Sequence, residues 1–167
     1  MVKKFKISQI TRIAVLGALL YAAQVTLSPL PNIEIVTLLI VVFTRNLGKE
    51  GTLACFVYVC LTAITWGFGL WWLTYLIIWP SFSLIVYKLR KTDSWIIWAV
   101  INAVFGLCFG AIFAIPYIFV SPSYALTYWI SGIPFDIAHC IGNFAIAILL
   151  GKVLDTTMAK IIKAIKI

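Results

Sequence analysis

The sequence predicts an all-α integral membrane protein, a bundle of six transmembrane helices that forms a single domain over residues 1–167. Hydrophobic residues make up 63% of the chain and charged residues 11%, whereas soluble domains average about 45–50% apolar and about 25% charged. The mean hydropathy is +1.10. The apolar residues also fall into six runs separated by short connections, which leaves no room for a soluble domain.

The six predicted helices occupy about residues 10–27, 33–46, 52–66, 70–89, 95–119 and 124–154. The first follows a basic, amphipathic stretch over 1–9 that resembles a signal peptide. Because no small-residue cleavage site follows it, we expect the helix to be retained. The second is short for a straight span of about 20 residues, so it is predicted to be tilted or interfacial.

Breaks between the helices coincide with proline and glycine. Pro29 and Pro31 follow the first helix, and Gly67 and Gly69 end the third. Pro80 lies inside the fourth, where neighbouring helices in a membrane can satisfy the carbonyl group that it frees.

The basic residues predict the orientation in the membrane. With six spans, every lysine and arginine falls on one side, whereas the opposite connections, 28–33, 67–70 and 119–124, contain none. The positive-inside rule then places both termini in the cytoplasm. We interpret the net charge of +8 as a topology signal and not as a nucleic-acid-binding surface. The basic residues are Lys3, Lys4, Lys6, Arg12, Arg45, Lys49, Lys88, Arg90, Lys91, Lys152, Lys160, Lys163 and Lys166.

The last predicted helix carries a polar seam. Tyr128, Gly132, Asp136, His139 and Asn143 fall on one helical face, at steps of four, four, three and four. Ionisable groups at membrane depth are costly and face a bundle interior or a wet cavity. The seam is explained either by ligand binding or by a structural hydrogen bond, between Asp136 and His139 or to a neighbouring helix.

Aromatic residues gather in the outer half of the predicted bundle. Trp71 and Trp72 suit an interfacial belt at headgroup level. Tyr75 and Trp79 share a face at a spacing of four, and Trp79 is too deep for such a belt. These two side chains therefore suit a stacking wall for a flat ring.

The sequence gives no indication of an enzyme, a metal site or a cofactor. Its cysteines, Cys55, Cys60, Cys108 and Cys140, lie in apolar runs without CxxC spacing. A single histidine cannot supply HExxH-type ligands, and no GxSxG motif is present. The GxxxxGK[ST] phosphate loop is also absent, so ATP-driven transport would need a partner ATPase.

Small residues form a stripe on the first predicted helix. Ala14, Ala18 and Ala22 repeat at a spacing of four, with Gly17 beside them. Such a stripe indicates close helix packing, either within the monomer or against another membrane protein. The spacing alone leaves both interpretations open.

Taken together, these features resemble the substrate-binding S component of energy-coupling factor (ECF) vitamin transporters. The resemblance covers nearly the whole chain. It depends on the six-span length, the alanine stripe, the motif PNIEIV after the first helix, and GIPFDIAHCIGNFAIAILL in the last.

The resemblance implies a six-helix bundle in a bacterial plasma membrane that captures a vitamin from outside. It implies as partners a transmembrane T component and two ATP-binding-cassette ATPases, with Ala14, Ala18 and Ala22 facing the T component. It also implies an outward pocket built from the loop after the first helix and from helices four to six. The corresponding positions are Asn32, Glu34, Trp71, Tyr75, Trp79, Tyr128, Trp129, Asp136, His139 and Asn143.

The residues of this pocket favour a flat, neutral or cationic ligand, because it contains carboxylates and no basic group. A pyridoxine- or thiamine-like heteroaromatic molecule ranks first, then riboflavin, with cobalamin as a further candidate. Two alternatives belong to other classes. A stand-alone carrier or channel would transport without partners, and a ligand-free structural subunit would bind no small molecule.

Overall fold

The computed structural model describes residues 5–165 and shows an all-α chain, with no β-strand in that range. The all-α prediction is therefore confirmed. Six helices follow one another: α1 (Ile7–Leu27), α2 (Val36–Leu47), α3 (Lys49–Trp66), α4 (Leu70–Leu89), α5 (Trp95–Ile118) and α6 (Pro122–Ala164).

Four helices of the described chain, α1, α4, α5 and α6, are long and apolar enough to cross a membrane. The protein is thus a multi-pass helical membrane protein. The helix α3 has 18 residues but begins with the charged pair Lys49 and Glu50. The helix α2 has only 12 residues, about 18 Å of helix against a hydrocarbon core of about 30 Å.

Four helix ends differ from the sequence prediction by three residues or more. The helices α1 and α3 begin three residues early, at Ile7 and Lys49. The second helix begins at Val36 instead of residue 33, because residues 28–35 form an irregular loop. The last helix continues ten residues beyond the predicted end at 154, to Ala164. The apolar run stops near Leu154, but charged helix-forming residues then continue the helix without a glycine or proline to break it.

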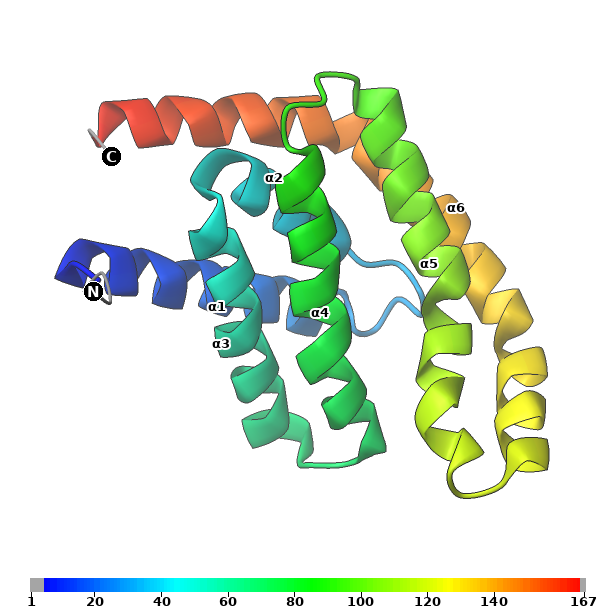
Figure 1. Cartoon of the computed structure of the whole chain (residues 1–167). Coiled ribbons are helices and arrows are strands. Elements are labelled where there is room, and N and C mark those ends of the chain that lie inside the picture. The colour runs from blue at the N-terminus through cyan, green and yellow to red at the C-terminus, as the bar shows by residue number, and fades with distance from the viewer. Residues whose placement is uncertain (1–4, 166–167) are drawn as a thin grey trace.

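The helices α3–α4 and α5–α6 form two antiparallel hairpins whose tight connections lie at the same end of the molecule (Figure 1). The helix α2 occupies only the opposite half of the bundle, and the loop 28–35 lies near mid-height (Figure 1). The helix α1 runs across the long axes of α3 and α4, and the C-terminal part of α6 bends toward the same side (Figure 1).

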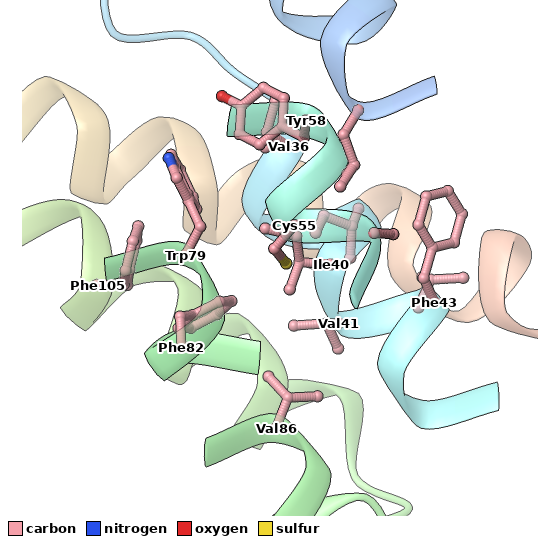
Figure 2. Packing of buried hydrophobic residues seen from close by; sticks show 14 of the residues in the cluster. Val36, Ile40, Val41, Phe43, Cys55, Tyr58, Trp79, Phe82, Val86 and Phe105 are labelled. Carbon is pink, nitrogen blue, oxygen red and sulfur yellow. The ribbon is translucent and has the colours of Figure 1, made fainter. Parts of the chain in front are cut away.

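The short helix α2 forms the centre of the core. Every residue from Val36 to Thr44 except Leu39 is buried. Cys55 and Tyr58 of α3, with Phe82 and Val86 of α4, pack around it (Figure 2). Because lipid tails are as apolar as these side chains, packing contributes more to such a core than exclusion from water does.

Charged contacts gather at the end of the bundle where α2 meets α3 and α4 meets α5. Arg12 of α1 pairs with Glu50 of α3 at 2.8 Å. Arg45 of α2 lies 3.3 Å from Asp155 of α6, donates to the carbonyl of Thr92, and stacks on the Trp95 and Trp98 rings. The grouping at one end agrees with the charge pattern of the sequence. Three of the basic residues used for that pattern lie outside the described residues: Lys3, Lys4 and Lys166.

Close approach of α5 and α6 depends on glycine at Gly106. A Cβ atom there would lie 2.9–3.0 Å from backbone atoms of His139 and Cys140. We therefore expect Gly106→Ala to destabilise the protein by about 1–3 kcal/mol, because rigid backbone must move apart. Thermal melting in detergent measures the change.

The matched control for this variant is Gly132→Ala on α6, where an added Cβ atom meets nothing within 4 Å of the described chain. Alanine has the higher helix propensity, so the control should leave stability unchanged or raise it. Equal melting temperatures for Gly106→Ala and the wild type would contradict the tight α5–α6 contact.

Candidate functional site

Three residues of the polar seam of α6 face the interior of the bundle, whereas Tyr128 at its start is exposed. Asp136, His139 and Asn143 are all buried on the same face of the helix. His139 Nε2 lies 3.4 Å from Glu34 Oε1, whereas Asp136 Oδ1 accepts a hydrogen bond of 2.9 Å from the Gly110 N–H group of α5. The two ionisable residues of the seam thus contact different partners instead of each other.

Glu34 is fixed by the first turn of α2. Its carboxylate accepts the Thr37 N–H group at 2.8 Å and the Thr37 hydroxyl. It therefore caps the N-terminus of the helix, where negative charge is favourable. Asn143 Nδ2 donates to Thr37 Oγ1 at 3.4 Å, so α6 supports the group that orients Glu34. Asn32 has a φ of 58°, a left-handed conformation that asparagine tolerates better than most residues.

A cavity of about 210 Å³ lies beside this carboxylate. All six helices and the loop 28–35 contribute to its walls. The polar lining consists of Gln24, Ser28, Asn32, Glu34 and His139, and the aromatic lining of Tyr58, Tyr75, Trp79 and Phe109. No lysine or arginine of the described chain lines it.

The aromatic wall of the cavity is internally braced. The Tyr75 and Trp79 rings meet edge to face at 5.5 Å, and Tyr58 meets Trp79 at 5.7 Å. Tyr58 donates a hydrogen bond of 2.6 Å to Gln24 Oε1, and Gln24 Nε2 donates to the Tyr75 hydroxyl at 3.3 Å. Gln24 thereby links α1 to both tyrosines, and the wall is held without a ligand.

One polar atom of this wall has no partner. Trp79 is 2% exposed, and its indole Nε1 has no hydrogen-bond acceptor within residues 5–165. Figure 2 shows this nitrogen and the Tyr58 hydroxyl on the same side of the cluster, away from Phe82 and Val86. Buried indole N–H groups are usually satisfied, so an unpaired one beside a cavity is consistent with an acceptor that a ligand supplies.

The structure brings together five of the ten residues predicted for the site: Asn32, Glu34, Tyr75, Trp79 and His139. Trp71 packs behind the wall, with its ring 5.3 Å from Tyr75. Asn143 and Asp136 lie buried beside the cavity without lining it.

Two predicted aromatic residues lie away from this cavity on the outer part of α6. Tyr128 is half exposed and packs on Tyr117 at 4.9 Å. Trp129 is 41% exposed and borders a separate surface hollow between α5 and α6. Both positions are typical of the interfacial belt that is the other explanation for outer aromatic residues.

Nine lining residues were missed from the sequence. Six belong to the end of α1, the loop 28–35 and the start of α2, and the other three are Gln24, Tyr58 and Phe109. Gln24 is an amide within an apolar run and Tyr58 carries a hydroxyl in the middle of one, which is the kind of signal that identified Asp136. Phe109 gives no such signal, because phenylalanine is an ordinary residue of a membrane helix.

Comparisons of the chain with models of known protein families, with curated proteins and with solved structures found no match. Fold and site alone therefore define the class: a multi-pass helical membrane protein with a partly open cavity lined by aromatic rings and a carboxylate.

Proposed function

We propose that this protein is the substrate-binding S component of an ECF-type importer, which captures a vitamin or vitamin precursor outside a bacterial plasma membrane. Both termini lie in the cytoplasm, and the loop 28–35 together with α2 counts as one of six crossings. The proposed partners are a T component and two ATP-binding-cassette ATPases, because the chain lacks a phosphate loop.

The observation that carries this proposal is the cavity itself. A structural subunit has no need for a hollow with a carboxylate, a histidine and an indole N–H group converging on it. Ligand sites are concave, mostly apolar, and contain a few placed polar groups. The basic end of the bundle is opposite the α3–α4 and α5–α6 connections, so the positive-inside rule makes those connections external.

The position of the alanine stripe supports a partner in the membrane. Leu16, Gly17 and Leu20 of α1 are buried, with Gly17 against Val57 of α3. Ala14, Ala18 and Ala22 are all exposed. The stripe is therefore not used for packing within the monomer, and small residues on an open face suit close approach by another helix.

Native mass spectrometry and transport assays together test the proposal. We expect the detergent-purified chain to retain a molecule of vitamin-like mass, and proteoliposomes that contain only this chain to show no uptake. Uptake without partners and without ATP would identify a stand-alone carrier instead. No retained mass, and no thermal stabilisation by any compound of a vitamin panel, would indicate a ligand-free structural subunit.

A further inference from the structure

We propose that the cavity selects a neutral or cationic single-ring heteroaromatic molecule, whose ring nitrogen accepts a hydrogen bond from Trp79 Nε1 and whose donor group faces Glu34. This inference rests on the proposed function and specifies the substrate class of that same site. Size, charge and hydrogen bonding each support it separately.

The size of the cavity restricts the ligand to one ring with small substituents. Its volume of about 210 Å³ equals that of about seven water molecules in the liquid. Pockets for drug-sized molecules measure about 300–1,000 Å³. Three fused rings with a sugar-like chain, or a corrin ring, would extend out of a cavity of this volume and leave much of the ligand outside the aromatic wall.

The charge of the lining excludes anions. Glu34 is the only carboxylate among the lining residues, and no lysine or arginine of the described chain offsets it. Two hydrogen bonds from Thr37 and the contact with His139 already use most of the acceptor positions of this carboxylate. A single further donor from the ligand completes its coordination, whereas a phosphate ester would face it without a counter-charge.

Hydrogen bonding requires an acceptor on the ligand. The Trp79 N–H group is buried beside the aromatic wall, and no described residue accepts from it. A donor left unpaired in this way costs free energy, which an acceptor in the plane of a flat ring recovers. A ring nitrogen is such an acceptor, and the surrounding tyrosine and phenylalanine rings suit the flat faces of the same molecule.

Calorimetric titration of the purified full-length chain tests all three restrictions. The single-ring probes are pyridoxine, nicotinamide and 4-amino-5-hydroxymethyl-2-methylpyrimidine; the large probes are riboflavin and cyanocobalamin; pyridoxine 5′-phosphate is the anionic probe. We expect a single-ring probe to bind at least 100-fold more tightly than the large and anionic probes.

The variant Trp79→Phe keeps an aromatic ring and removes the N–H group. We expect it to weaken the tightest single-ring probe at least tenfold, since a buried hydrogen bond is lost. Trp129→Phe removes the same group at an exposed position away from the cavity, and it should leave affinity unchanged.

A second measurement needs no change to the protein. The carbocyclic analogue of the best probe, such as benzamide for nicotinamide, lacks the ring nitrogen and should bind the wild type at least tenfold more weakly. Equal affinity for the two compounds, or for wild type and a folded Trp79→Phe, overturns the hydrogen bond to Trp79.

The remaining outcomes separate this inference from the proposed function. Tight binding of riboflavin or cyanocobalamin in preference to every single-ring probe overturns the size restriction but leaves a vitamin-binding subunit in place. Preference for pyridoxine 5′-phosphate overturns the charge restriction in the same way. Binding of no probe, together with no retained mass in native mass spectrometry, overturns the inference and the proposed function together.

Discussion

Replacing Glu34 by glutamine is expected to weaken binding of a cationic single-ring ligand by about 100-fold. Loss of one partner from a desolvated charge pair typically costs 2–5 kcal/mol, and 100-fold corresponds to about 2.7 kcal/mol. Glutamine keeps a side-chain oxygen for the Thr37 N–H group, so α2 retains a cap and the loss reports mainly on charge. Calorimetric titration with a pyridine or pyrimidine that carries its charge on a protonated exocyclic amine, which leaves the ring nitrogen free to accept from Trp79, measures it.

The matched control for this variant is Glu50→Gln. Glu50 is also a partly buried carboxylate, but it pairs with Arg12 at the basic end of the bundle and does not line the cavity. Its replacement should lower stability and leave affinity unchanged. A similar loss of affinity in both variants would mean that the effect of Glu34 is a general loss of fold.

Arg45→Ala is expected to give the largest loss of stability, about 3 kcal/mol, because it leaves a partly buried carboxylate without its counter-charge. The Arg45 guanidinium joins Asp155 of α6 to the Thr92 carbonyl and covers the Trp95 and Trp98 rings. Asn46 also donates to Asp155, at 2.7 Å, and would keep only part of the contact. Arg45→Lys should recover little, since an ammonium group lacks the fork of donors that reaches Asp155 and the Thr92 carbonyl together.

Thermal melting and amide hydrogen exchange check this expectation. Exchange should quicken in residues 152–164, the part of α6 that Asp155 anchors. The control is Arg90→Ala, which removes a guanidinium stacked on Tyr87 at 4.0 Å within one helix end. Unchanged protection of residues 152–164 in Arg45→Ala would show that α6 is held by packing alone.

Much of the helical layout follows from the sequence, because apolar runs in a membrane protein must be helices and glycine and proline mark their ends. The buried face of α6 could also be predicted from the sequence, since Asp136, His139 and Asn143 are polar residues in an apolar run and fall on one side of the helix. The contact partners of these side chains could not be predicted in the same way. That His139 meets Glu34, and Asp136 meets a backbone N–H group of α5, depends on how α5 and α6 approach through Gly106 and Gly110.

Outer aromatic residues show the limit of the sequence pattern most clearly. Trp79 and Trp129 both lie in the N-terminal half of an apolar helix, yet one lines the cavity and the other is 41% exposed. The composition and spacing of aromatic residues alone do not separate an interfacial belt from the aromatic wall of a binding cavity. Only the packing of α4 against α3 and α5, which buries Trp79 against Tyr58 and Phe105, separates the two.

The late start of α2, at Val36, has a consequence for the cavity. A full-length second helix would place side chains through the space now bounded by Asn32, Glu34 and Tyr58. In the proposed six-span topology, about 12 Å of a crossing of about 30 Å is left to irregular backbone, which is tolerated at such depth only when protein encloses it or water reaches it. The absence of helix between Pro31 and Val36 thus leaves the space that a bound molecule can fill.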